Sequence, residues 1–257
     1  GRVSHSKVRS KAMITTIPVI QAHRGAGRLG PENTLPSFQL TWHMGLVPEA
    51  DIRATRDGVI VCFHDDNLKR LTPKAPPEIQ SKAIGDLNWD QIAGLDAGVE
   101  AGSPFQGQRI PRLRDVFADM RDHADRRLYM DIKKVSFKEL ADLASEYGVQ
   151  KQLIVASTRY DELKEWASLV PGAQTLLWMG DTEEHLRKRM EDLKAEDFRG
   201  ITQLQIHVKV VDLSKPDPFA PSSEFLRETG RILKSHGILF QSLPLNSSAD
   251  ETYHRLM

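Results

Sequence analysis

Two histidines and two closely spaced carboxylates lie between residues 21 and 71: His23, His64, Glu49 and Asp51. Imidazoles exchange protons near neutral pH, so one can protonate a leaving alkoxide while the other deprotonates an attacking oxygen. Carboxylates are the usual protein ligands of hard divalent cations. Metal-assisted cleavage of a phosphate ester requires side chains of these types. We therefore interpret the chain as an enzyme.

A third carboxylate and two cationic side chains extend this set. Asp131 and Lys133 alternate along a predicted strand, and residues two apart on a strand face the same side, about 6–7 Å from each other. Arg24 follows the first histidine directly. Both cations can hold non-bridging phosphate oxygens, the arginine through two parallel hydrogen bonds.

Three converging carboxylates repel one another unless a cation neutralises them. We therefore expect one divalent cation, Mg²⁺ or Ca²⁺, bound by Glu49, Asp51 and Asp131. The alternative is a set of surface carboxylates paired with Arg53 and Lys133, which would contribute little to either stability or chemistry.

The composition is that of an ordinary globular protein. The chain has 257 residues, of which 40% are hydrophobic and 27% charged, enough to bury a proper core. Lys+Arg and Asp+Glu both number 35, so no net charge points to nucleic acid or an anionic membrane surface. No apolar run approaches the roughly 18 residues of a spanning helix. The single cysteine, Cys62, excludes an internal disulfide and a cysteine-rich metal site.

These features predict a soluble protein without stable membrane insertion, whose partner is a small phosphodiester and not nucleic acid. They leave its oligomeric state open. They also leave two compartments open, the cytoplasm or an export route with the signal peptide already removed.

Short apolar β-type runs alternate with longer amphipathic stretches, which is typical of a parallel sheet wrapped by helices. Seven such units favour an α/β fold of the TIM-type (β/α) barrel class over an open sheet. The expected strands are 17–21, 47–52, 128–132, 153–156, 175–179, 201–208 and 237–242. The expected helices are 35–44, 112–121, 137–147, 160–169, 182–193 and 222–235.

One connection departs from this alternation. Residues 52–58 leave room only for a turn, at Asp57-Gly58, whereas a parallel crossover needs a dozen or more residues. Residues 59–63 must therefore return as a hairpin, which brings His64 beside the level of Asp51.

The remaining organisation is simple. Residues 72–110 contain proline and glycine clusters and are expected to form a small irregular insertion after the hairpin. Residues 1–16 are polar and basic and are expected to be a flexible arm. Residues 17–257 are expected to form a single domain.

At these residues the chain resembles the glycerophosphodiester phosphodiesterase family. The resemblance rests on motifs that occur in order and is strongest from residue 21 to 133: His23-Arg24-Gly25, Pro31-Glu32-Asn33-Thr34, Glu49-x-Asp51, Thr55-x-Asp57-Gly58, His64-Asp65, Leu68-x-Arg70-x-Thr72, Arg109-Ile110-Pro111-x-Leu113 and Asp131-Ile132-Lys133.

The resemblance implies a TIM barrel that uses one divalent metal to hydrolyse glycerophosphodiesters to an alcohol and glycerol phosphate. It makes His23 and His64 the acid–base pair. It also implies that Glu49, Asp51 and Asp131 bind the metal and that Arg24 and Lys133 hold phosphate. The attacking group is either water or a substrate hydroxyl.

Three departures from the family pattern concern the metal, the substrate and the chain end. The family usually has Glu where this chain has Asp131. Its late Trp-Thr-Val-Asn strand is replaced by residues 240–244, so an aromatic platform for glycerol is missing there. Its closing Gly-x-Asp-Gly-x-x-Thr-Asp segment has no counterpart before Met257, so the last strand is expected to be missing and the sequence to be a truncated form of a longer protein.

Two other residues are candidates for contact with the substrate. Trp178, at the end of a predicted strand, is a candidate to replace the missing platform; a core or rim position is the alternative. Gln205 and its neighbour His207 alternate on another strand whose polar side is expected to face the barrel mouth. The alternative for these two is a satisfied polar group in the core.

Two other functions remain open. Asp131 and the missing tryptophan are compatible with a phospholipase D-like activity on lysophospholipids or sphingolipids, whose enzymes share this barrel. A barrel retained as a binding module without turnover is the second alternative.

Overall fold

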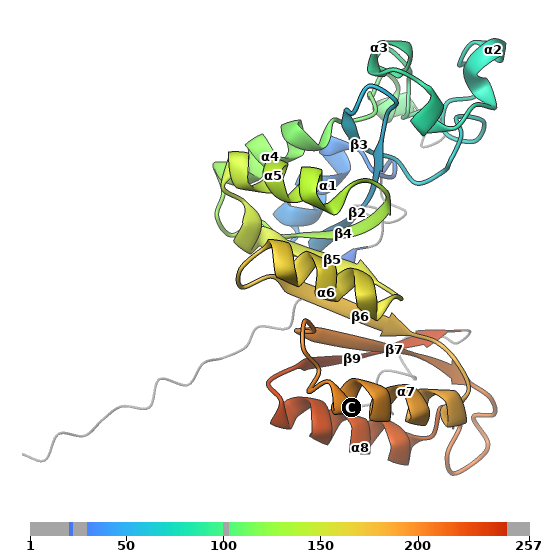
Figure 1. Cartoon of the computed structure of the whole chain (residues 1–257). Helices are drawn as coiled ribbons and strands as arrows, with labels where there is room; N and C mark the ends of the chain where they lie inside the picture. The colour runs from blue at the N-terminus through green and yellow to red at the C-terminus, as the bar shows by residue number, and fades with distance from the viewer. Residues whose placement is uncertain (1–20, 23–29, 100–102, 246–257) are drawn as a thin grey trace, which may run out of the picture.

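The computed structural model describes residues 21–22, 30–99 and 103–245 (Figure 1). The strands are β1 (Gln21–Ala22), β2 (Val47–Ala54), β3 (Ile60–Cys62), β4 (Leu128–Lys134), β5 (Leu153–Ser157), β6 (Gln174–Met179), β7 (Gln203–Val210), β8 (Phe219–Ala220) and β9 (Leu239–Leu245). The α-helices are α1 (Leu35–His43), α2 (Pro77–Gln80), α3 (Trp89–Ile92), α4 (Leu113–Arg121), α5 (Phe137–Tyr147), α6 (Tyr160–Leu169), α7 (Glu183–Ala195) and α8 (Ser223–Ser235). Short 3-10 helices cover η2 (Ile84–Asp86), η3 (Ser103–Phe105) and η4 (Gln150–Gln152).

The sheet is parallel in chain order. Parallel pairing joins the successive members of one series of strands, as the alternating pattern predicted: β1, β2, β4, β5, β6, β7 and β9. Two short strands are antiparallel additions. β3 returns along β2 as the expected hairpin, and β8 pairs with the end of β7. The pattern did not predict β8, because two residues between Pro218 and Pro221 carry no strand periodicity.

Helix starts follow local capping chemistry. Ser136, Thr182 and Ser222 precede α5, α7 and α8, and each side-chain oxygen accepts a hydrogen bond from a backbone N–H in the first turn. Gly148 ends α5 in the left-handed region, at φ 67°. These caps fix where α5, α7 and α8 begin and where α5 ends.

The alternation of side chains along each strand separates two buried layers. One face packs against the helices and forms the large outer core, which includes Ile52, Met130, Val155 and Leu204. The other face forms a smaller inner cluster of Tyr129, Ile154, Ala156 and Leu176, with Val47 and Trp178 packed against it.

The sheet curves around this inner cluster. The Tyr129 hydroxyl on β4 donates a 2.7 Å hydrogen bond to Gln203 Oε1 on β7, although β5 and β6 lie between these strands. The inward residues of β4 and β7 therefore face the same interior, as in a TIM-type barrel.

The segment after β3 has a small hydrophobic core of its own. Its buried members are Val61, Phe63, Leu68, Leu71, Ala75, Ile79, Ile84, Leu87, Ile92, Ala97 and Ile110. Figure 1 shows α2 and α3 beyond the hairpin, away from α7 and α8. This cluster holds the loop that follows His64.

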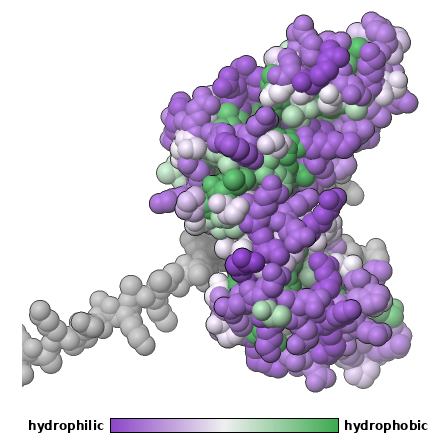
Figure 2. Space-filling model, in the orientation of Figure 1, coloured by the Kyte–Doolittle hydropathy of each residue, from purple (hydrophilic) through white to green (hydrophobic). Residues whose placement is uncertain are grey.

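The visible surface is largely polar. Figure 2 shows hydrophilic side chains over most of the displayed face, with the hydrophobic side chains gathered mainly in its upper half. Within the described ranges, no helix has the length and apolarity to span a bilayer.

Candidate active site

Three carboxylates converge on two neighbouring strands, β2 and β4. Glu49 and Asp51 alternate on β2, and Asp51 is the direct register partner of Asp131 on β4. One carboxylate oxygen from each residue lies within 4.8 Å of the other two. Glu49 is 9% exposed and Asp51 only 1% exposed. Asp131 is partly exposed. Three converging anionic oxygen donors, two of them on buried residues, fit a hard divalent cation in both charge and chemistry.

Asn33 fixes the most buried of these carboxylates. Its Nδ2 donates to Asp51 Oδ2 at 2.9 Å, and its Oδ1 accepts from the Asp51 backbone N–H at 2.9 Å. Asn33 has φ 54°, a left-handed conformation that Asn adopts more readily than most residues. This backbone turn directs the amide at Asp51.

Lys133 balances part of the negative charge. Its Nζ lies 2.8 Å from Asp131 Oδ2 and 3.4 Å from Asp51 Oδ1. Burial alone would lower the pKa of Lys133, but the two carboxylates raise it, so the ammonium stays charged.

Arg53 is not the partner that the surface-pairing alternative required. Its Nε and Nη2 donate to the His64 carbonyl at 3.1 and 2.7 Å, and its Nη1 lies 3.5 Å from Asp66 Oδ1. Arg53 therefore anchors the backbone at His64.

The hairpin places His64 next to the carboxylates. The Phe63 N–H donates to the Asp51 carbonyl at 2.9 Å, so Phe63 lies opposite Asp51. His64 is the next residue along the chain. On this hairpin Cys62 is fully buried, and burial together with the nearby Asp51 raises the pKa of its thiol. Cys62 is thus an inert core residue.

His64 is held by a chain of charged groups. Its Nδ1 lies 2.9 Å from Asp65 Oδ1. Arg70 donates to both oxygens of Asp65, at 3.0 and 2.8 Å, and a third bond of 2.7 Å goes from Arg70 to Glu32. The Arg70 guanidinium, helped by His64, lowers the pKa of Asp65 from its usual 3.8 to about 2. An ionised Asp65 only accepts, so it fixes the proton of the imidazole on Nδ1.

Two predicted substrate contacts lie on the far side of the same interior. Trp178 on β6 is the register partner of Gln205 on β7. Both side chains are half-buried, and neither is fully enclosed in the core. The predicted acid–base partner His23 and the phosphate-binding Arg24 lie outside the described residues.

Sequence reasoning assigned no role to four residues that now surround the site. Glu32, Asn33, Asp65 and Arg70 all belong to motifs quoted above, but Glu32 and Asn33 have side-chain partners that are distant in sequence. Asn33 contacts a residue 18 positions away, and Glu32 contacts one 38 positions away. Spacing within one strand cannot reveal such pairs.

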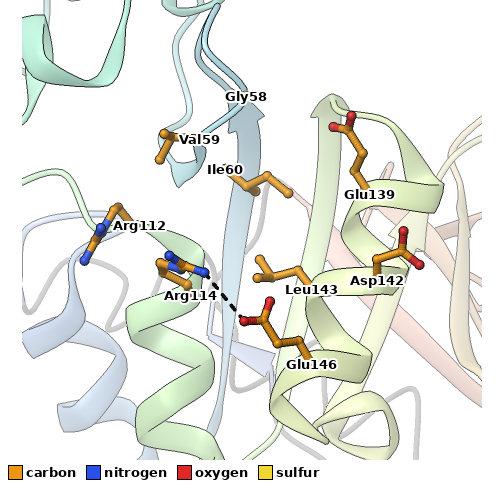
Figure 3. A pocket seen from close by; sticks show the side chains of 9 residues that line it. All are labelled: Gly58, Val59, Ile60, Arg112, Arg114, Glu139, Asp142, Leu143 and Glu146. Atoms are coloured by element: carbon orange, nitrogen blue, oxygen red, sulfur yellow. Dashed lines mark ion pairs between the residues drawn. The ribbon is translucent and has the colours of Figure 1, made fainter.

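Two surface grooves are separate from the carboxylates. One, of about 430 Å³, lies between the hairpin, α4 and α5, where Arg114 faces Glu146 at 3.8 Å (Figure 3). The other, of about 580 Å³, is lined by residues of α1 and by Trp89, Ile110 and Pro111. Neither groove includes a residue of the triad.

Comparisons with known proteins agree with this geometry. A sequence model of the Glycerophosphoryl diester phosphodiesterase family matches residues 23–217. The chain is 29% identical over 190 residues to a glycerophosphodiester phosphodiesterase of Caldanaerobacter subterraneus subsp. tengcongensis, covering 70% of this chain and 75% of that protein. A Bacillus subtilis protein of the same name is 23% identical over 255 residues, covering 92% and 78%.

A solved structure shares the fold. An Oleispira antarctica phosphodiesterase, in complex with the product sn-glycerol-3-phosphate, superposes with a TM-score of 0.66 at 23% identity, covering 93% of this chain and 90% of that one.

Proposed function

Because the chain belongs to the Glycerophosphoryl diester phosphodiesterase family, we propose that it hydrolyses glycerophosphodiesters to an alcohol and glycerol 3-phosphate. The observation that carries this proposal is the triad of Glu49, Asp51 and Asp131, with His64 on the adjoining hairpin. The glycerol 3-phosphate bound to the Oleispira antarctica phosphodiesterase supports the same product here.

The triad is the proposed site of one divalent cation, Mg²⁺ or Ca²⁺. When bound there, such a cation polarises the phosphoryl group and balances charge on the attacking and leaving oxygens. The chain prepares the site beforehand, since Asn33 holds both the side chain and the backbone of Asp51 in place.

His64 is the proposed proton-transfer group on the hairpin side. Asp65 holds Nδ1, which directs Nε2 to the reacting oxygen. His23 is the proposed second member of the acid–base pair. One imidazole takes a proton from the attacking oxygen, and the other gives a proton to the leaving alkoxide. Together they avoid a charged alkoxide in the transition state.

Lys133 and Arg24 are the proposed phosphate-binding groups. Lys133 already points between Asp131 and Asp51, where its charged amine can also reach a non-bridging phosphate oxygen. Arg24 directly follows His23 in the sequence, and its guanidinium is the second proposed phosphate ligand.

The test is hydrolysis of a panel of glycerophosphodiesters and lysophospholipids by the full chain, after EDTA treatment and after adding back Mg²⁺ or Ca²⁺. We expect release of glycerol 3-phosphate that EDTA abolishes and one of the two cations restores. Release of lysophospholipid headgroups alone would instead indicate the phospholipase D-like alternative. Binding of metal and glycerol phosphate without hydrolysis of any diester would indicate a binding module.

A further inference from the structure

The two halves of the barrel interior differ in charge. Strands β2 and β4 contribute the triad and Lys133. The inward residues of β6, β7 and β9 include Leu176, Trp178, Gln203, Gln205, His207 and Gln241. Among the described residues this second half contains no carboxylate. The next residue on that face of β7, Lys209, is exposed and carries a positive charge.

The three glutamines of this half form a hydrogen-bonded ladder. Gln205 Nε2 donates to Gln241 Oε1 at 3.0 Å, and Gln241 Nε2 donates to Gln203 Oε1 at 3.4 Å. Gln203 is 5% exposed, and its Oε1 also accepts the hydrogen bond from Tyr129. The buried lower end of the ladder is therefore anchored, while Gln205 and Gln241 are half-buried and line the interior.

Gln205, at the end of the ladder away from Gln203, lies at the same height in the barrel as the triad. The Tyr129–Gln203 hydrogen bond places these two residues across the interior from each other. Asp131 and Gln205 each lie two residues further along their parallel strands, which is about 6–7 Å closer to the carboxyl ends. Gln205 therefore lies across the interior from Asp131, at the same level as the triad.

An aromatic pair completes this wall. The rings of Trp178 and His207 stack with centroids 5.0 Å apart and planes 17° from parallel. Burial lowers the pKa of His207, so the imidazole is neutral and can both donate and accept a hydrogen bond. His207 covers one face of the indole, so that face is not available to a cation.

We propose that the wall formed by Trp178, Gln205, His207 and Gln241 is the subsite for the substrate's alcohol moiety, and that it selects uncharged, hydroxyl-bearing headgroups over ammonium headgroups. Trp178 then contacts the alcohol and does not replace the missing glycerol platform. Amides and a neutral imidazole match hydroxyl groups, because all of these donate and accept hydrogen bonds. A primary ammonium group only donates and a quaternary ammonium group has no N–H to donate, and neither finds a carboxylate among the described residues of this wall. The inference rests on the proposed hydrolysis of glycerophosphodiesters and specifies the kind of headgroup that these diesters carry.

The experiment compares four diesters that share the glycerol phosphate part. Two have uncharged polyol headgroups, bis(glycero)phosphate and glycerophosphoinositol, and two have cationic ones, glycerophosphocholine and glycerophosphoethanolamine. The full chain is assayed with its activating divalent cation. We expect kcat/KM to favour the polyol diesters by about tenfold or more, which is the discrimination that one well-placed hydrogen bond gives.

The Gln205→Glu variant tests the wall directly. It keeps the shape of the side chain but adds a negative charge, so the polyol-to-ammonium ratio should fall by about tenfold. Gln91→Glu is the matched control. Gln91 Oε1 accepts from the Asn88 N–H at 2.8 Å in the insertion, and a glutamate can accept the same bond.

Two results would overturn the inference: a wild-type preference for the ammonium diesters, or an unchanged ratio in Gln205→Glu when that variant still hydrolyses diesters. Should wild-type protein hydrolyse none of the four, the proposed function fails by itself. Their binding affinities, measured by calorimetry on the same wild-type protein, then decide the inference. Tighter binding of the polyol diesters supports it, and equal or weaker binding rejects it.

Discussion

Glu32 and Asn33 are adjacent along the chain, yet their side chains hold two different parts of the site. Asn33 binds Asp51 of the carboxylate triad, while Glu32 accepts a 2.7 Å hydrogen bond from Arg70, which in turn clamps Asp65 beside His64. The left-handed φ of 54° at Asn33 lets consecutive side chains diverge in this way. One dipeptide thus couples the position of the proposed metal ligands to that of the proposed proton-transfer group.

Asn33→Gly should weaken binding of the divalent cation. Glycine tolerates the positive φ but removes both hydrogen bonds to Asp51, leaving that carboxylate less well oriented. Loss of such a supporting contact typically costs roughly tenfold to a hundredfold in metal affinity. Calorimetric titration of the full chain with Mg²⁺ or Ca²⁺ measures the change.

Asn88→Gly is the matched control for that titration, because Asn88 caps α3 in the insertion and glycine is tolerated at such a position. Equal metal affinity of Asn33→Gly and wild-type protein would contradict the role given to Asn33.

Arg70→Met should lower kcat more than it raises KM. The variant removes both hydrogen bonds to Asp65, so His64 loses the support of its Nδ1 partner. A small misplacement of a catalytic group can cost on the order of a hundredfold in rate. Arg70→Lys should recover only part of the loss, because an ammonium cannot reproduce the bidentate fork. Steady-state kinetics with the preferred diester separates the two parameters.

Arg114→Met is the control for general effects of losing an arginine. Arg114 pairs with Glu146 at 3.8 Å on the outer face (Figure 3) and should leave kcat unchanged when replaced. An Arg70→Met protein with normal kcat would show that His64 needs no such support.

The pattern of the sequence predicted most of the fold because each strand carries its own signal. The hairpin is the clearest case, since the short spacing before Val59 leaves no room for a crossover and β3 indeed pairs antiparallel to β2. Boundaries were less accurate. β7 extends to Val210, two residues beyond the predicted end, because its last residues pair with the unpredicted β8.

The proposed ligands could also be found from sequence, because Glu49 and Asp51 share one strand face and Asp131 repeats the pattern on the next parallel strand. The supporting network could not. The contact between Glu32 and Arg70 depends on how the insertion folds back, and no local periodicity encodes it. The glutamine ladder likewise depends on the register between β7 and β9.

His64→Ala should abolish turnover and leave the fold intact. The imidazole is only half-buried, so its removal opens no large cavity, while loss of proton transfer costs about a hundredfold or more in rate. His23→Ala should have the same effect. His43→Ala, on the last turn of α1, is the control. Circular dichroism confirms folding, and near-normal activity in both site variants would exclude the proposed mechanism.

Asp65 should make stability depend on pH in the acid range. Arg70 lowers the pKa of Asp65 in the folded protein from its usual 3.8 to about 2. Ionised Asp65 therefore stabilises the folded state above about pH 4, and this contribution is lost as the pH falls towards 2. The difference in free energy of unfolding between wild-type protein and Asp65→Asn should shrink over that interval. Urea denaturation at several pH values measures it, and a constant difference would refute the assignment.

Two variants of Asp131 distinguish the contribution of its charge to metal binding from the contribution of its geometry. Asp131→Asn keeps the shape but removes one negative charge and weakens the 2.8 Å contact with Lys133, so affinity for the divalent cation should fall by at least about tenfold. Asp131→Glu keeps the charge and should retain binding, with an altered rate because the carboxylate lies one methylene further from β4. Calorimetry and turnover measured on both variants distinguish these effects. Unchanged affinity in Asp131→Asn would remove Asp131 from the proposed ligands and leave it as the partner of Lys133.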